Sequence, residues 1–158
     1  MQEKTNAVRI VERMKLSYKT HTYDSSQAIS GVEVAQQLGQ NPDKVFKTLV
    51  TTGKTGKHYV FVIPVAEGLD LKKAAKAVSE KSIEMLKQKD LLALTGYVHG
   101  GCSPIGMKKF FTTTIDETAT LSDTIIFSGG RIGLQLEMTL ESLQKAIRLQ
   151  TAQLTTEQ

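Results

Sequence analysis

Hydrophobic residues recur with a helical period in several parts of the chain. The period predicts helices over residues 6–15, 30–39 and 70–78, one or two helical turns over 90–96, and a last helix that starts near Leu140. Ser30 and Glu33 form a capping box at the start of the second helix, and Asp70 can cap the third. The capping residues and the periodicity therefore predict the same helix starts.

Runs of β-branched and aromatic residues separate these helices. They predict strands over residues 17–24, 45–53, 58–65, 110–115, 124–127 and 133–138. A glycine-containing turn joins the second and third strands, which predicts a hairpin. Residues 82–86 fit neither the helical nor the strand period. The pair Gly129 and Gly130 is expected to end the strand that precedes it. The polar tail after Leu149 is expected to fray.

The order of these elements favours one fold class. Strands and helices are interspersed without a strict strand–helix–strand rhythm, so we expect an α+β fold with a mixed sheet rather than a doubly wound one. A chain of 158 residues is long enough to bury a core and short enough to make a second domain unnecessary. We therefore expect a single domain over 1–158, with frayed ends at 1–4 and 151–158.

Composition and cysteine usage narrow the setting. Hydrophobic residues make up 40% of the chain and charged residues 23%, which is typical of a globular protein that folds without a cofactor. The single cysteine cannot form an internal disulfide and the N-terminal segment has no apolar signal core, which together predict a cytoplasmic location. No run approaches the roughly 18 apolar residues of a membrane span, so no membrane partner is expected.

The net charge of +4 favours a polyanionic partner without identifying one. Its distribution is uneven, because lysines gather in the middle of the chain, at positions 72, 73, 76, 81, 87, 89, 108 and 109. Such a cluster is either a solvated face or a surface that contacts the phosphates of a nucleic acid.

Several common catalytic designs find no support. The histidines at positions 21, 58 and 99 are far apart and the cysteine has no partner at ligand spacing, so no metal site is expected. Gly53, Lys54 and Thr55 resemble the end of a phosphate-binding loop, but the glycine that this motif needs earlier is absent. The nucleophile elbow of serine hydrolases is absent as well.

Three features remain as candidates for chemistry. Lys47 shares its predicted strand face with apolar residues, so its ammonium either extends past them to solvent or points into a cavity where it can stabilise an anion. Gly100 and Gly101, and then Gly129 and Gly130, offer backbone amides to a ligand or serve only as tight turns. Cys102 is either a nucleophile or, as most lone cysteines are, a small apolar residue.

Five segments, in an order and spacing that run through nearly the whole chain, match motifs of one family. They are HTYD at 21–24, FKTLV at 46–50, LKKAAKAV at 71–78, TGYVHGGCSPIGMKK at 95–109 and SGGRIGLQLEM at 128–138. The sequence resembles the YbaK/EbsC family of aminoacyl-tRNA deacylases, and is most similar to free-standing bacterial members that clear Cys-tRNA(Pro). The resemblance implies an α+β single domain whose mixed, partly barrel-like sheet is flanked by helices.

The resemblance also implies roles for particular residues. The essential lysine of the family falls on Lys47, which would be catalytic. The positions that would bind the substrate are Tyr23, Gly100, Gly101, Ser128, Gly129 and Gly130. The position of Cys102 accepts ordinary apolar residues in this family, which argues against a cysteine nucleophile. Ile132 stands where free-standing members often have a second basic residue.

The activity implied by the resemblance is trans-editing, the hydrolysis of the ester of a mischarged tRNA without a metal or cofactor. The implied partner is tRNA(Pro), and prolyl-tRNA synthetase is a further partner in a ternary complex. For Cys-tRNA(Pro), the substrate's own thiol would attack its ester. Two alternatives stay open from the sequence: a deacylase for another mischarged tRNA such as Ala-tRNA(Pro), or a non-catalytic module that binds tRNA or a synthetase.

Overall fold

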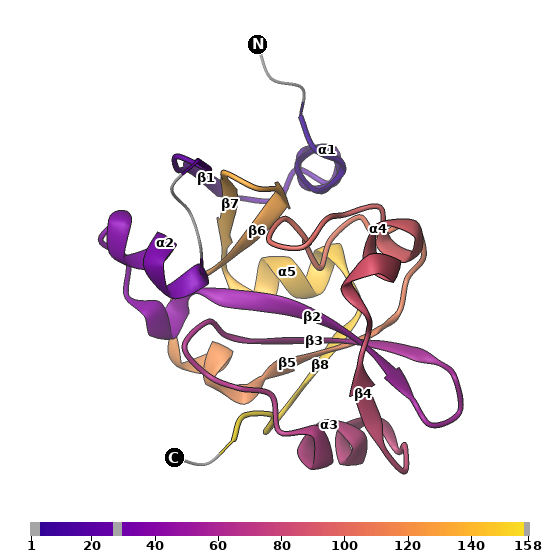
Figure 1. The fold of residues 1–158 in the computed structure, drawn as a ribbon. Coiled ribbons are helices and arrows are strands. Elements are labelled where there is room, and N and C mark those ends of the chain that lie inside the picture. The colour runs from indigo at the N-terminus through magenta and orange to yellow at the C-terminus, as the bar shows by residue number, and fades with distance from the viewer. Residues whose placement is uncertain (1–3, 27–29, 157–158) are drawn as a thin grey trace.

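The computed structural model describes residues 4–26 and 30–156, and within them the strands form two sheets (Figure 1). The three-stranded sheet has the order β1-β7-β6, all antiparallel, from β1 (Lys19–Thr22), β6 (Ile125–Arg131) and β7 (Leu134–Met138). The five-stranded sheet has the order β4-β2-β3-β5-β8, from β2 (Phe46–Gly53), β3 (His58–Pro64), β4 (Ile83–Met85), β5 (Thr112–Asp116) and β8 (Leu149–Ala152). β3, β5 and β8 run parallel to one another, so this sheet is mixed.

Helices cover the sheets and supply part of the core. They are α1 (Asn6–Arg13), α2 (Gly31–Gln37), α3 (Leu71–Val78), α4 (Gln88–Thr95) and α5 (Leu140–Ala146), with short 3-10 turns η1 (Pro42–Lys44) and η2 (Glu117–Leu121). Ser30 and Asp70 cap α2 and α3 through their side chains, as the capping signals predicted, and Thr5 caps α1 in the same way. The helix prediction is therefore confirmed, with ends that differ by a few residues.

The main core lies between the two sheets. Phe46, Val62 and Ile115 of the five-stranded sheet pack there with Phe127 and Leu136 of the three-stranded sheet, and α1 and α5 add further buried side chains. The sheets also meet edge to edge, because Val45 forms a parallel bridge with Ile126. The result is a mixed sheet system that curves around one core without closing, which confirms the predicted α+β, partly barrel-like fold.

A second, smaller core lies on the other face of the five-stranded sheet, where helix α3 packs (Figure 1). Ala74 and Ala75 of α3 contact Phe61 and Ile63 of β3. The segment 82–86, which fitted neither period, contains the short edge strand β4, and its Ile83 belongs to this core.

The prediction that Gly129 and Gly130 end a strand is wrong. β6 continues through Arg131, and the pairing with β7 shifts its register between Ser128 and Arg131. The glycines thus form a bulge within the strand instead of a break.

The prediction of frayed residues after Leu149 is also wrong for the described part of the tail. β8 pairs in parallel with β5, and Leu154 is fully buried. The backbone N–H of Leu154 donates to the buried carboxylate of Asp116 at 2.9 Å, while its carbonyl accepts from Asp70 N–H at 2.7 Å. Of the predicted frayed ends, residues 1–3 and 157–158 lie outside the described residues.

The burial of Leu154 gives a stability prediction. Leu154→Ala should lower the free energy of unfolding by about 2–5 kcal/mol, because it leaves a cavity in the core beneath α3. Chemical denaturation measures this, with Leu121→Ala as the control, since Leu121 is 82% exposed and its loss should change stability by less than about 0.5 kcal/mol. Equal stabilities of the two variants would contradict a packed tail.

Candidate functional site

The bulged hairpin of β6 and β7 contains three of the predicted site residues. Ser128, Gly129 and Gly130 form its bulge, and the hydroxyl of Ser128 accepts the backbone N–H of Gly130 at 3.2 Å. Gly130 has a φ of +107°, which a residue with a side chain adopts only with strain. The carbonyl of Gly129 accepts the hydroxyl of Thr5 at 2.5 Å. The bulge is thus held from within the hairpin and from the start of α1.

The second glycine segment lies directly against this hairpin. A Cβ atom at Gly101 would sit 2.9 Å from the backbone nitrogen of Ile132 and 3.0 Å from backbone atoms of Arg131, so no side chain fits there. Gly100 is exposed and faces the side chain of Ile132. The structure therefore brings together the two glycine segments that the sequence singled out separately.

Side chains from outside the predicted set anchor the glycine loop. The hydroxyl of Tyr97 donates to the carbonyl of Ile105 at 2.7 Å, and the amide of Asn6 donates to the carbonyl of Gly106, also at 2.7 Å. Burial raises the pKa of Tyr97 to about 12, so its phenol stays a hydrogen-bond donor. Sequence reasoning missed Tyr97, although it is the one aromatic residue inside the GYVHGGCSPIG loop.

Lys47 lies on the face of β2 that is turned away from the main core, next to β6. Val45 bridges Ile126 in parallel, and two residues further along each strand Lys47 and Ser128 point to the same side. Lys47 is partly buried, and among the described residues its ammonium makes no hydrogen bond or salt bridge. Burial lowers the pKa of Lys47 from its ordinary value, and the charge of Glu67 opposes this shift.

A pair of glutamine amides, one of them buried, extends the same side of the sheet. Gln135 of β7 lies opposite Ser128 and is only 5% exposed. Its amide oxygen accepts from the amide of Gln40 at 2.7 Å, and its amide nitrogen donates back at 3.3 Å. Gln40 follows α2, so this pair ties the end of that helix to the strands beside Lys47. The alternation of apolar and polar residues in LQLEM is the sequence signal for this polar face.

Glu137 forms an ion-pair cluster two residues beyond Gln135. Its carboxylate accepts from the hydroxyl of Thr124, lies 2.7 Å from Nε2 of His21 and lies 3.4 Å from Nζ of Lys44. Burial by itself would raise the pKa of Glu137, but the hydrogen bonds from Thr124 and His21 and the charge of Lys44 outweigh it and lower the pKa to about 2. Glu137 is thus ionised at neutral pH, and Thr124, His21 and Lys44 all contact its carboxylate.

Tyr23 lies at the end of β1, beside the turn between β6 and β7. Its backbone N–H donates to the carbonyl of Gly133 at 3.0 Å. Its side chain is partly buried, and its hydroxyl makes no hydrogen bond to another described residue. The hairpin of β6 and β7 therefore touches Tyr23 on one side and the Gly100–Gly101 segment on another.

Cys102 is not placed to act as a nucleophile. It is 7% exposed and packs in the main core. Burial raises the pKa of its thiol to about 12, so the reactive thiolate does not form near neutral pH. This agrees with the expectation of a small apolar residue at this position.

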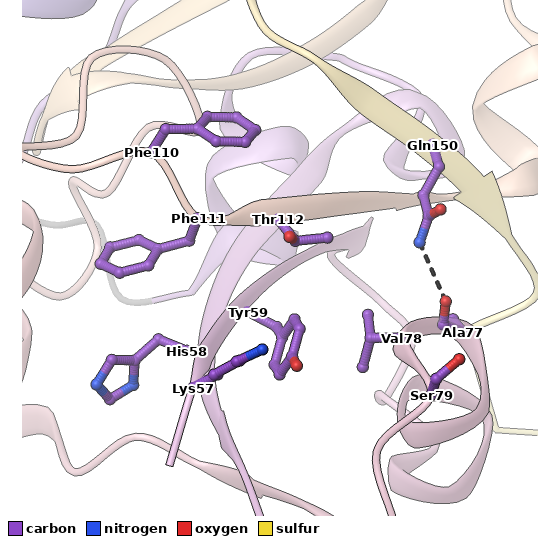
Figure 2. A pocket seen from close by; sticks show the side chains of 10 residues that line it. All are labelled: Lys57, His58, Tyr59, Ala77, Val78, Ser79, Phe110, Phe111, Thr112 and Gln150. Atoms are coloured by element: carbon purple, nitrogen blue, oxygen red, sulfur yellow. Dashed lines mark hydrogen bonds between the residues drawn. The ribbon is translucent and has the colours of Figure 1, made fainter. Parts of the chain in front are cut away.

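Two cavities among the described residues are not lined by Lys47. One, of about 650 Å³, opens where β3 and β5 begin (Figure 2). The other, of about 480 Å³, has an acidic wall that includes Asp43, Glu67 and Asp116. Glu67 is also the residue whose charge acts on Lys47, so this second cavity adjoins the predicted site.

Within residues 4–26 and 30–156, no three His, Cys, Asp or Glu side chains are grouped as metal ligands, and no helix has the length and apolar character to cross a membrane.

The fold is α+β, and the site brings strand β2, which carries Lys47, together with the segments Gly100–Gly101 and Gly129–Gly130. The site contains no nucleophilic thiol among the described residues. A family model described as the aminoacyl-tRNA editing domain matches residues 26–146, and the chain belongs to this family. The chain is also 46% identical over 158 residues to EbsC of Enterococcus faecalis, named as a candidate Cys-tRNA(Pro)/Cys-tRNA(Cys) deacylase. That match covers 99% of this chain and 96% of the relative, and it confirms the resemblance seen in the motifs.

Solved structures share the fold at lower identity. A candidate trans-editing enzyme for prolyl tRNA synthetase superposes with a TM-score of 0.84 at 23% identity, covering 99% of this chain and all of the other. A hypothetical protein superposes with a TM-score of 0.85 at 20% identity, covering 96% and 99% of the two chains. These similarities show that the whole chain adopts the fold of these proteins.

The Glu137 cluster predicts a pH dependence of stability. Because the folded-state pKa of Glu137, about 2, lies below its ordinary value of 4.5, its contribution is fully present above about pH 4.5 and is lost as the pH falls towards 2. Unfolding curves of the wild type and Glu137→Gln between pH 2 and 7 should therefore differ most at neutral pH and converge in acid. A constant difference across this range would contradict the assignment.

Proposed function

We propose that this protein is a trans-editing hydrolase that deacylates mischarged tRNA, with Cys-tRNA(Pro) as its substrate. Family membership supports an editing activity, and the extensive identity to EbsC supports the cysteine substrate. The observation that carries the proposal is the arrangement of Lys47: a partly buried ammonium without an ion-pair partner among the described residues, on the same side of the sheet as Ser128.

The reaction requires little from the protein beyond positioning of the substrate and stabilisation of the developing charge. An aminoacyl ester is already activated, so binding it in a reactive geometry and stabilising the oxyanion that develops on its carbonyl supply most of the acceleration. An ammonium whose pKa is lowered by burial is poorly solvated, and it therefore gains most when an anion forms beside it.

In the proposed mechanism the substrate provides its own nucleophile. The cysteinyl sulfur attacks the ester carbonyl; the new C–S bond forms, the bond to the ribose oxygen breaks, and the thiol proton ends on that oxygen. The products are free tRNA and a cyclic thiolactone, which water then hydrolyses to cysteine. The protein supplies no thiol, which is consistent with the buried, protonated Cys102.

The site residues take complementary roles in this proposal. Lys47 orients the tRNA terminus or stabilises the developing charge. Backbone amides near Gly100 and Gly101 hold the aminoacyl group; the N–H of Gly101 itself donates to the carbonyl of Val98 at 3.0 Å, and the absence of a side chain at Gly101 lets the loop lie against the hairpin. The wall of the pocket is completed by Tyr23, Ser128, Gly129 and Gly130.

Such an activity has a physical rationale. A synthetase pocket shaped for proline rejects amino acids of equal or smaller size by only a modest free energy, so binding alone does not exclude cysteine or alanine. A second hydrolytic site corrects these errors. We also propose that prolyl-tRNA synthetase joins the complex, because a net charge of only +4 gives the free protein modest affinity for tRNA.

Lys47→Ala tests the catalytic assignment. It should lower kcat/KM for hydrolysis of Cys-tRNA(Pro) by about a hundredfold or more, because the charge opposite the developing oxyanion is lost. Release of radiolabelled cysteine from charged tRNA measures the rate. Gly101→Val should also abolish activity by displacing the hairpin, whereas Cys102→Ala should keep nearly full activity. Undiminished hydrolysis by Lys47→Ala, or its loss in Cys102→Ala, would overturn the assignment.

A panel of mischarged tRNAs tests the substrate. Cys-tRNA(Pro) should be hydrolysed much faster than Ala-tRNA(Pro) or Ser-tRNA(Pro), since only cysteine carries the attacking thiol. Addition of prolyl-tRNA synthetase should sharpen the preference for tRNA(Pro) over tRNA(Cys). Faster hydrolysis of Ala-tRNA(Pro) would assign a different substrate, and failure to hydrolyse any member would favour a non-catalytic binding module.

A further inference from the structure

The cavity at the start of β3 and β5 has no role in the proposed reaction. It has a volume of about 650 Å³ and is bounded on one side by the C-terminal end of α3. Figure 2 shows the rings of Phe110 and Phe111 along one side, with His58 below Phe111 and the Lys57 ammonium in front of Tyr59. The cavity therefore combines aromatic rings with a cation at its mouth.

The aromatic wall is only partly used by the fold. Phe111 packs against the main core and meets the ring of His58 edge-on, with centroids 5.7 Å apart. Phe110 is 58% exposed, and the core does not need it. Phe110 lines the open cavity with an exposed ring, so it can contact a ligand that enters there. Its face is available for a planar ring to stack on.

Positive charge surrounds these rings. Lys57 is exposed in the cavity wall, and Lys108 and Lys109 come directly before Phe110. On α3 and just after it, the exposed side chains of Lys76 and Lys81 flank the lining residues 77–79.

The carboxylate of Glu80 offsets part of this charge, because the charge of Lys57 acts on Glu80 and helps to lower its pKa, but the lysines at positions 57, 76, 81, 108 and 109 outnumber it. Glu80 accepts hydrogen bonds from the hydroxyls of Thr55 and Tyr59, which engage its side chain within the fold. Rings for stacking beside lysines for phosphates are the combination by which proteins hold unpaired nucleotides.

Gln150 adds a polar group to the same wall. Its amide nitrogen donates to the carbonyl of Ala77 at 3.1 Å and to the hydroxyl of Thr114 at 3.0 Å, which fixes the side chain (Figure 2). Among the described residues the amide oxygen has no hydrogen-bond partner, so it can accept from a base edge.

The cavity is separated from the proposed catalytic lysine. Lys47 lies opposite Ile63 on β3, whereas the cavity reaches Tyr59, four residues earlier on the same strand. Four residues of a strand span about 13 Å, which is more than one nucleotide. A single tRNA can thus place its aminoacylated end at Lys47 and another nucleotide at this cavity.

From this arrangement we propose that the cavity binds an unstacked nucleotide of the tRNA, together with its phosphate, at a distance from the aminoacyl end. This inference rests on the proposed function for its substrate. The acidic cavity beside Asp43, Glu67 and Asp116 offers no such site, because its carboxylates repel phosphate. The two cavities therefore differ in the sign of charge as well as in position.

The test compares Phe110→Ala, Lys57→Gln and the double variant with the wild type. The double variant should bind uncharged tRNA(Pro) about tenfold more weakly, in filter-binding assays, since it loses a stacking partner and a phosphate contact. The salt dependence of binding should fall by about one phosphate contact. For Cys-tRNA(Pro) hydrolysis, KM should rise by a similar factor while kcat stays within about twofold.

Three controls make the result specific. Lys57→Arg keeps the charge and should retain wild-type affinity, and Leu121→Ala removes an exposed apolar side chain from the acidic cavity and should have no effect. Cysteine esterified to a single adenosine is too short to reach the cavity, so wild type and variants should hydrolyse it equally. Thermal melting curves confirm that the variants are folded.

The outcomes separate this inference from the proposed function. If the wild type hydrolyses Cys-tRNA(Pro) and the double variant binds and hydrolyses it equally well, the nucleotide site is overturned and the function stands. If the wild type hydrolyses no mischarged tRNA but the variants lose tRNA affinity as expected, the site stands and the function falls. Unchanged RNA affinity with weakened binding to prolyl-tRNA synthetase would overturn the site in favour of a protein partner.

Discussion

The backbone contact between Gly101 and residues 131–132 is the constraint on which the candidate site depends. A Cβ atom at Gly101 would clash with the main chain of the hairpin. The loop and the hairpin can therefore form a single surface only when this residue is glycine. The start of α1 reinforces the contact from both sides, because Thr5 bonds to the hairpin through Gly129 and Asn6 bonds to the loop through Gly106. The first helix is thus a structural part of a site to which it contributes no predicted functional residue.

The electrostatic environment of Lys47 depends on the hydrogen bonds and ion pairs made by a neighbouring carboxylate, Glu137. Glu137 lies on the same side of the sheet, and an unpaired carboxylate there would compete with an anionic substrate for the lysine. Thr124, His21 and Lys44 instead engage Glu137, which keeps it ionised and occupied. The lysine is left with the longer-range field of Glu67 and with the burial that lowers its pKa. Both conditions leave the ammonium available to a developing negative charge.

Local signals predicted the helices and most strands because caps and periodicity act within a few residues. The described tail was mispredicted because its order comes from distant partners: Asp116 accepts from Leu154, and β5 supplies the strand beside β8. For the same reason the bulge at Ser128 could not be inferred, since two glycines in sequence favour a break as readily as a register shift. Motifs identified the site residues individually, but not the Gln40–Gln135 pair, whose members are far apart in the chain.

The protonated state of Cys102 bears on how specificity can arise. A reactive thiol near the aminoacyl group would attack any ester presented to it, and would discriminate between amino acids only by pocket shape. Here the one thiol of the chain is buried and its pKa is raised to about 12, so it is not available as a nucleophile at neutral pH. If the nucleophile belongs to the substrate, selection occurs in the chemical step, because alanine and serine esters fit the same space but lack the sulfur. A pocket built from backbone amides and one lysine is then sufficient, since the amino acid itself determines whether the ester is cleaved.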